Sequence, residues 1–215
     1  MYRYIQASPY FETFRKSGRE VLFVYNAIDD FVMNNIKKYN DRTLTTAETE
    51  GLDLGGADSD AVAEANAEAA AALTAAEADE LGLWLTSTAL AGRVSNVRTT
   101  NRLSDSPAIV SSMESGALRR MLRYVEQANT GAEAAMPLQK LEINPAHPIV
   151  IGLHRLIAAD AEMARAIAEQ LFDNALVAAG LMEDSRVMLP RLNTLMQTVL
   201  EKSAAGAGGG GTTEA

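Results

Sequence analysis

The residues able to bind a metal or move a proton are few in this chain. Its two histidines are His147 and His154, and it has no cysteine. With Glu142 they offer one carboxylate and two imidazoles, which are donor types that zinc accepts. The alternative is structural, because His147 stands between Pro145 and Pro148, where a histidine can cap a helix or make a hydrogen bond in the core. We favour that alternative and expect no metal site and no other cofactor in this chain.

Catalysis by paired carboxylates or by a phosphate loop is not expected either. Asp29 and Asp30 are adjacent, and adjacent side chains on a helix point about 100° apart, so they do not share a proton. Gly55-Gly56 lacks a following lysine, and the glycine run 208–211 lacks a following helix, so neither resembles a phosphate-binding loop. We therefore expect no catalytic residues, and the chain is not expected to be an enzyme.

The composition favours protein partners over nucleic acid or membrane. Of the 215 residues, 47% are hydrophobic and 22% are charged, which suits one or two domains with cores of their own. The formal net charge of -9 repels nucleic acid and anionic lipid, since both are bound mainly through Lys and Arg. An apolar run such as Val21–Tyr25 is far shorter than the roughly 18 residues that a membrane helix needs.

Residues 1–54 are expected to form a small αβα module that ends in a further short strand. The first helix begins at Pro9 and ends at Gly18, because proline suits a first helical turn and glycine the residue just past the last one. The run Val21–Tyr25 predicts a buried strand, and the closing short strand lies around Leu44. The helix between them is indicated by an apolar stripe of Ile28, Val32, Ile36 and Tyr39.

Residues 55–73 are expected to form an Ala- and Gly-rich linker or insert, because they hold few large apolar residues that could join a core. Residues 74–202 predict an α+β domain. A capping box from Thr74 to Glu77 begins a helix that stops at Gly92. Residues 203–215 are Gly-rich and predict a disordered tail. Between the first helix and the last two, strands and helices are expected at Val94–Leu103, Ile109–Val110, Met113–Gln127, Leu141–Ile143 and Ile149–Ile157.

Two amphipathic helices, Glu162–Ala179 and Val187–Lys202, end this domain and predict a homodimer. The short turn Gly180–Asp184 makes them antiparallel, and one hairpin cannot bury both of their apolar faces. Two hairpins related by a twofold axis can do so in a four-helix bundle. Pro190 lacks a backbone donor and is expected to bend the last helix. The expected dimer interface comprises Met163, Ile167, Leu171, Phe172, Ala175, Met188, Leu192, Leu195, Met196 and Val199.

The predicted helix Met113–Gln127 has an unusually wide apolar face. Its apolar side chains cover about half of the circumference, against about 100° for an ordinary core stripe, and three arginines fill the other side. Two explanations stay open. Either the domain core and the dimer partner bury the whole face, or part of it is a surface for unfolded chains, which flexible Met and amphipathic Tyr suit.

Three parts of the sequence carry the motifs of one family. Leu141–Pro148 reads LEINPAHP, and Gly18–Tyr25 with Ile28–Phe31 reads GREVLFVY and IDDF. Asn101–Leu103 and Ser106–Ala108 read NRL and SPA. These segments resemble the LEINPxHP, EVLxxxxxIDE and NRLxxSPA motifs of the heat shock protein 90 family. The resemblance covers nearly the whole chain and implies the end of the middle domain followed by the C-terminal dimerisation domain.

That resemblance implies the homodimerisation and client-binding region of an ATP-dependent stress chaperone, which acts in protein folding. Its partners would be a second copy of itself and unfolded or partly folded client proteins. The family binds ATP and Mg²⁺ in an N-terminal domain whose motifs do not occur in this sequence. A purely structural dimerisation scaffold without a client surface is the alternative. Matched by position, the family's client contacts fall on Asp30, Phe31, Asn34, Met121, Tyr124 and Val125.

The resemblance also bears on compartment and co-chaperones. Asp173–Ala175, Ala178–Leu181 and Arg191–Asn193 are most similar to the mitochondrial branch of the family and next most to the bacterial one. This implies the mitochondrial matrix, with the cytoplasm as the alternative. Cytosolic members end in an acidic MEEVD peptide that tetratricopeptide co-chaperones bind, whereas this sequence ends Gly211–Ala215. Such co-chaperones are therefore not expected as partners.

Overall fold

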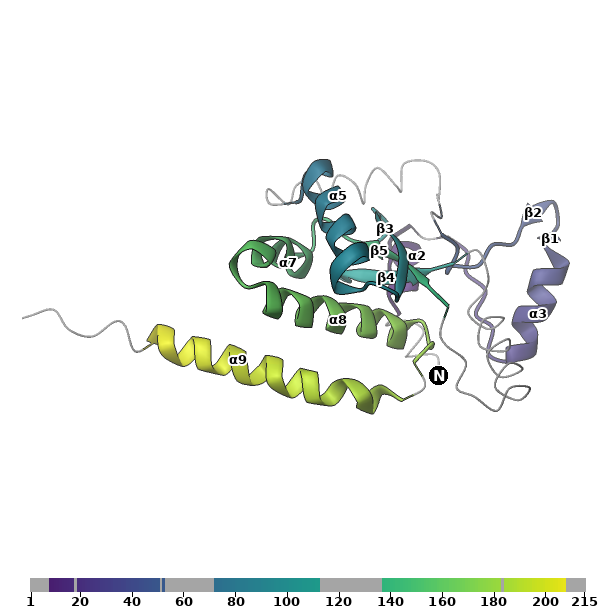
Figure 1. Ribbon diagram of the computed structural model, residues 1–215. Helices are drawn as coiled ribbons and strands as arrows, with labels where there is room; N and C mark the ends of the chain where they lie inside the picture. Colours follow the sequence, from purple (N-terminus) through teal and green to yellow (C-terminus); the bar gives the residue numbers. More distant parts are fainter. Residues whose placement is uncertain are drawn as a thin grey trace, which may run out of the picture.

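The computed structural model describes residues 8–17, 19–50, 52, 72–112, 137–182 and 184–207. Figure 1 shows a small module with one longer helix and a two-stranded hairpin, beside a larger module in which helices surround a three-stranded sheet. This mixture of helix and strand is consistent with the predicted α+β class. Most of the predicted linker at 55–73, the helix expected at 113–127 and the last eight residues lie outside the described residues.

The first module begins with a 3-10 helix, Pro9–Phe11, that continues into α2 (Glu12–Ser17). The next helix, α3 (Ala27–Ile36), starts at a capping box. In this box Asp29 Oδ2 accepts the backbone N–H of Asn26 at 3.1 Å, which satisfies a donor at the helix start. Asp29 is therefore a capping residue, and its place at the helix N-terminus accounts for an acidic side chain there.

A tight hairpin follows α3. The strands β1 (Lys38–Tyr39) and β2 (Arg42–Thr43) are antiparallel, and β2 corresponds to the short strand expected around Leu44. The two turn residues, Asn40 and Asp41, have φ values of 49° and 60°. Asn and Asp tolerate this left-handed conformation better than other non-glycine residues, and two-residue hairpin turns of this kind require it.

The run Val21–Tyr25, expected as a buried strand, forms no regular strand, so that prediction is wrong for the chain as described. Leu22 is 68% exposed, while Phe23 packs on Phe11 with ring centroids 5.4 Å apart. A strand needs a neighbour for its backbone hydrogen bonds, and no segment within the described ranges pairs with this run. The module therefore carries an exposed apolar surface, which we call the first-module surface, made of Leu22, Val24, Tyr25, Ile28, Val32, Ile36 and Tyr39.

The sheet of the larger module has β5 (Gln139–Ile143) at its centre. On one side β5 pairs in parallel with β3 (Val94–Thr99), and on the other it pairs in antiparallel with β4 (Ala108–Ser111). Leu141 lies opposite Val97 on β3 and opposite a buried valine on β4. All three strands were expected from their apolar runs; the central residues of β4 and β5 are buried, whereas those of β3 are half-buried.

The helix before the sheet begins and ends as the sequence predicts. In α5 (Ala75–Trp84) the side chains of Thr74 and Glu77 form the expected capping box. The helix is prolonged by a π-helical turn, Leu85–Ala89, and the chain then reverses at Gly92, whose φ is 76°. That conformation suits glycine because it has no Cβ.

The described part of the module contains three further helices: α7 (Pro148–Ala159), α8 (Ala161–Ala178) and α9 (Leu189–Ala207). In Figure 1, α8 lies between the sheet and α9, and α9 is the outermost helix. A core of fully buried side chains joins the sheet to α5, α7 and α8. Its large members include Leu81, Leu85, Leu90, Leu141, Ile143, Leu153, Phe172 and Leu176.

Two expectations for the last helix need correction. A turn of 3-10 helix, Ser185–Met188, leads into α9, so Pro190 is only the second residue of the α-helix. At that position its missing N–H removes no hydrogen bond of the α-helix. The helix also continues to Ala207, beyond Lys202, where its end was expected. Gly180, with a φ of 63°, ends α8 as predicted.

A buried carboxylate joins the first module to the second. Glu12 Oε2 accepts the backbone N–H groups of Ser104, Asp105 and Ser106 at 3.0, 3.1 and 3.3 Å. The hydroxyl of Ser106 donates to the other oxygen of Glu12, which is only 8% exposed. Nearby, the hydroxyl of Tyr10 donates to the carbonyl of Val110 on β4. The start of the chain is thus fixed to a loop about 90 residues further along.

The two ends of the predicted linker are also held. Glu50 pairs with Lys140 on β5 at 2.6 Å, and its backbone N–H donates to the Ser112 carbonyl at 3.2 Å. After the linker, the N–H of Leu73 donates to the Pro145 carbonyl at 3.0 Å. The residues on either side of the linker are therefore tied to the same sheet region.

We expect Glu12→Ala to lower the free energy of unfolding by about 1 to 3 kcal/mol, because it leaves buried backbone donors without an acceptor. The matched control is Arg15→Ala, which removes an ion pair to Asp105 between side chains that are 52% and 66% exposed. It should cost at most about 1 kcal/mol. Urea denaturation measures both values, and equal losses in the two variants would contradict the role given to Glu12.

Candidate dimerisation interface

The LEINPAHP segment connects neighbouring parts of the fold through hydrogen bonds. The side chain of Asn144, 1% exposed, donates to the carbonyls of Leu103 and Ser106 at 3.2 and 3.4 Å. Its Oδ1 accepts the N–H of Ala146 at 3.0 Å. One amide therefore connects the end of β5 to the loop that carries the NRL and SPA motifs. Two of the three motif regions meet through this residue.

His147 caps α7, which is the structural alternative expected from the sequence. Its Nδ1 accepts the N–H of Ile149 at 3.1 Å, so the ring must be unprotonated on that nitrogen. Burial lowers the pKa of His147, against opposing effects of the Asp105 backbone and of nearby carboxylates. The other two candidate metal ligands lie in separate contacts. Glu142 pairs with Arg102 at 2.9 Å, and His154 lies 3.5 Å from Glu80.

Three of the expected interface residues belong to the core of the single chain. Leu171, Phe172 and Ala175 are 5%, 1% and 2% exposed, because this side of α8 packs on β4 and the rest of the core. A second chain does not reach them, so they are removed from the candidate interface. Met163 and Ile167, on the same helix, are half-buried.

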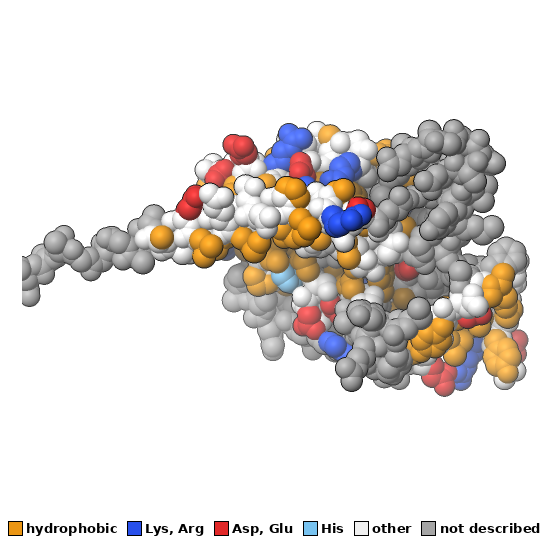
Figure 2. All heavy atoms as spheres, turned by 90° about the horizontal axis from the view of Figure 1, so that it is seen from below, with side chains coloured by type: hydrophobic (Ala, Val, Ile, Leu, Met, Phe, Trp, Pro, Cys, Tyr) orange, Lys and Arg blue, Asp and Glu red, His pale blue; other side chains and the backbone are white. Residues whose placement is uncertain are grey.

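The other expected residues lie on α9 or just before it. Met188, Leu192 and Leu195 are half-buried, whereas Met196 is 55% exposed and Val199 is 64% exposed. Figure 2 shows hydrophobic side chains in a row along one edge of α9, with charged side chains gathered on its other edge. We call this row the α9 apolar face; it consists of Leu189, Leu192, Met196, Val199 and Leu200.

Sequence reasoning missed three exposed apolar side chains that lie on α9 or just before it. Leu200 is 70% exposed, Leu189 is 48% exposed and Val187, just before α9, is 71% exposed. The signal was available, because Leu189, Met196 and Leu200 are seven and four residues apart and so lie on one side of a helix. The expected interface included Leu192 and Leu195 instead, which are half-buried beside α8.

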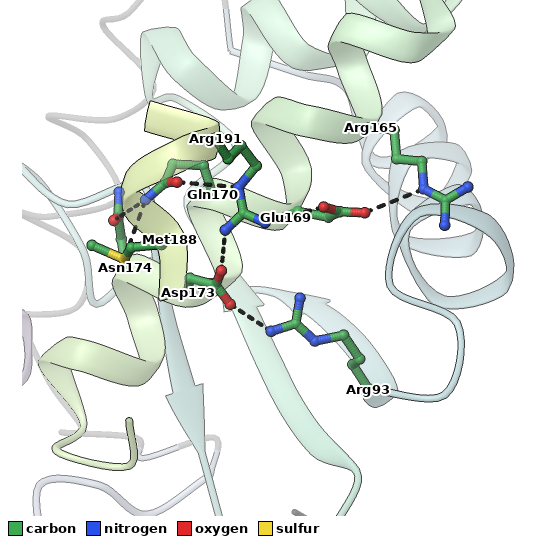
Figure 3. Close-up of polar contacts among 8 residues, drawn as sticks. All are labelled: Arg93, Arg165, Glu169, Gln170, Asp173, Asn174, Met188 and Arg191. Atoms are coloured by element: carbon green, nitrogen blue, oxygen red, sulfur yellow. Dashed lines mark hydrogen bonds and ion pairs between the residues drawn. The ribbon is translucent and has the colours of Figure 1, made fainter. Parts of the chain in front are cut away.

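A network of charged and polar side chains fastens α9 to α8 (Figure 3). Arg191 Nη1 lies 3.1 Å from Glu169, and its Nε donates to Gln170 at 3.2 Å. Its Nη2 pairs with Asp173, whose other oxygen pairs with Arg93 at 2.5 Å. Arg93 also lies over the Phe172 ring, 4.7 Å from its centroid. At the far end of the helix, Lys202 pairs with Asp160, the N-cap of α8, at 3.3 Å.

The client contacts expected from the resemblance lie outside the part of the structure that can be described. Met121, Tyr124 and Val125 fall in residues 113–136, and of Asp30, Phe31 and Asn34 only the backbone, within α3, is described. The exposed first-module surface includes side chains of that same helix. In the described part of the chain, none of the helices combines the length and the apolar character needed to cross a bilayer.

Comparison with known proteins identifies the family. The chain matches the model described as Hsp90 protein over residues 2–208. It is 36% identical to heat shock protein 75 kDa, mitochondrial, of Rattus norvegicus, over 91% of this chain and 27% of the relative. For the TNF receptor-associated protein 1 homolog, mitochondrial, of Dictyostelium discoideum these values are 35%, 91% and 26%. For chaperone protein HtpG of Desulfitobacterium hafniense they are 36%, 91% and 30%.

The chain therefore belongs to the Hsp90 family, as its motifs indicated. It spans 26% to 30% of the length of these three relatives. The name of one describes a heat shock protein and that of another a chaperone, and two of the three are mitochondrial.

We expect the free energy of unfolding to decrease as the pH is lowered, because His147 titrates differently in the folded and the unfolded chain. Its pKa is lower in the folded chain than the unfolded value of 6.5, so protons bind preferentially to the unfolded chain. The free energy of unfolding should therefore decrease as the pH falls below about 6.5, toward the lower folded pKa. His147→Asn keeps a side-chain acceptor at the N-cap but does not titrate, and it should show a shallower decrease.

The control for this experiment is His147→Ala, which removes the cap as well. It should lower the free energy of unfolding by about 0.5 to 2 kcal/mol at neutral pH, where the unmodified cap is intact. Denaturant titrations at several pH values test both expectations. If His147→Asn lost stability as steeply as the unmodified chain, the dependence would belong to other groups.

Proposed function

We propose that the chain is the homodimerisation and client-binding region of an Hsp90-type chaperone, from the end of its middle domain through its C-terminal dimerisation domain. The observation that carries the proposal is the α9 apolar face. Met196, Val199 and Leu200 are each more than half exposed on a helix that packs on its own chain with its opposite side. Membership of the Hsp90 family supports an unfolded-protein-binding role and a dimeric assembly.

A second copy of the chain is the partner that this face fits. Five large apolar side chains per chain, ten in a symmetric pair, gain about 1.5 to 3 kcal/mol each when fully buried. With roughly half of that surface covered by the partner, the pair gains on the order of 8 to 15 kcal/mol. This is comparable with the estimated 4 to 15 kcal/mol cost of association. A twofold axis lets the same face serve both chains, which produces a bundle of two α8–α9 hairpins.

Three further parts of the proposal rest on the family. Client proteins bind at α3 and at the segment around Met121, Tyr124 and Val125. ATP and Mg²⁺ bind in parts of the parent protein outside this chain, which has no ATPase activity of its own. The mitochondrial names of two relatives support the mitochondrial matrix, with the cytoplasm as the alternative. The second candidate function is a structural dimerisation scaffold without a client surface.

We expect Met196→Glu with Leu200→Glu to convert a dimer into a monomer, because it places four unpaired charges in the pair's apolar contact. Both side chains are exposed in the single chain, so the fold should be retained. Sedimentation velocity at micromolar concentration measures the change. The control is Thr194→Glu with Gln197→Glu, which adds the same charge on the polar edge of α9. A monomeric unmodified chain at this concentration would contradict the proposal.

We expect replacement of Met121, Tyr124 and Val125 by Ser to weaken suppression of the aggregation of a heat-denatured reporter enzyme. These apolar side chains would bind exposed apolar segments of the reporter. The dimer and the melting temperature should stay nearly unchanged. The control replaces Arg119, Arg120 and Arg123, on the other side of the predicted helix, by Ser. If the unmodified chain did not suppress aggregation, the scaffold alternative would hold instead.

A further inference from the structure

The attachment of α9 to its own chain depends little on buried apolar contacts. Among residues 189–204 of α9, whose burial is described, none belongs to the buried core, and the last core residue along the chain is Leu181. The apolar residues nearest α8, Leu192 and Leu195, are only half-buried. At 100° per residue, the apolar side chains from Leu195 around to Leu200 span about 140° of the helix. A stripe this wide can pack on α8 in more than one rotation of α9, so apolar packing alone does not select one.

The polar network does discriminate between rotations. Arg191 reaches three acceptors on α8, which are Glu169, Gln170 and Asp173. A guanidinium has a rigid planar set of donors, and these contacts are kept only in one orientation of the helix that carries it. The Arg191 side chain is 21% exposed and that of Asp173 is 6% exposed, so solvent does not readily replace these contacts.

Asp173 also links α9 to the sheet. Its Oδ1 pairs with Arg93, which directly precedes β3, and its Oδ2 pairs with Arg191 (Figure 3). Each carboxylate oxygen therefore has its own guanidinium. Removal of Arg191 would leave a buried carboxylate with one of its two cationic partners. By contrast, the Lys202–Asp160 pair at the other end is 62% and 39% exposed, and exposed pairs of this kind contribute little.

We infer that Arg191 and Asp173 are positioning residues that fix the rotation of α9 and so determine which of its side chains form the α9 apolar face. In the observed rotation Leu189, Met196 and Leu200 point away from α8 and toward the surface offered to a second copy. The link to dimerisation rests on the proposed function. The positioning itself is a property of the single chain and is measurable without it.

The absence of cysteine makes an intramolecular distance measurement direct. Spin labels at Glu162→Cys on α8 and Gln197→Cys on α9, both exposed positions, report the distance between the two helices. Labelled chains are mixed with about a tenfold excess of unlabelled chain, so that most labelled chains pair with an unlabelled copy. We expect one narrow distance distribution in the otherwise unmodified chain. Arg191→Met should broaden or shift it.

Two further variants separate geometry from charge. Arg191→Lys keeps the charge but offers a single nitrogen to three acceptors, and it should broaden the distribution nearly as much as Arg191→Met. The matched control is Arg186→Met, which removes an exposed arginine paired with Asp184 in the preceding turn. It should leave the distribution unchanged. The only tryptophan, Trp84 on α5, reports by its fluorescence whether the core stays folded in every variant.

The dimer is the second measurement. The dissociation constant from sedimentation should rise about tenfold or more in Arg191→Met. A narrow, unshifted distribution in Arg191→Met, with the core folded, would overturn the inference. A broadened distribution with an unchanged dissociation constant would overturn its link to the interface. If the unmodified chain were a monomer, the proposed function would be contradicted, but the inference about positioning would not be, because the distance distribution tests it in the single chain.

Discussion

The pairing of β5 with strands on both of its sides is the interaction on which the rest of the structure depends. β5 holds β3 and β4 together, and its buried residues Leu141 and Ile143 form the base of the core. Asn144, directly after the strand, fastens the loop that in turn binds Glu12 of the first module. The same segment then starts α7 at His147. Loss of this strand would disconnect the first module, α7 and the sheet at once.

The sequence was most informative where structure is decided locally. The capping box of Thr74 and Glu77 and the left-handed glycines at 92 and 180 fix helix ends through contacts within a few residues. It was misleading for Val21–Tyr25, because an apolar run becomes a strand only where another strand can pair with it. The same limit applies to Pro190, whose effect depends on whether α9 begins before or after it.

The predicted interface residues differ in their exposure within the single chain. Met196 and Val199 are exposed on α9, as a dimer surface requires, whereas Leu171, Phe172 and Ala175 are enclosed by the core. A helical wheel shows that a face is apolar but not which neighbour covers it. The most apolar face of α8 packs on the sheet of its own chain. The contact between Arg191 and Asp173 was beyond sequence reasoning, since 18 residues separate two side chains that read as solvent-facing charges.

The anchoring of the linker's two ends has an evolutionary consequence. Glu50 and Leu73 are each tied to the region around β5 by contacts of their own. The entropy cost of closing a chain between two fixed points rises slowly with its length, by about 0.6 kcal/mol for each doubling. Insertions and deletions between Glu50 and Leu73 can therefore accumulate over generations nearly neutrally, while the sheet and the α8–α9 hairpin remain under separate selection.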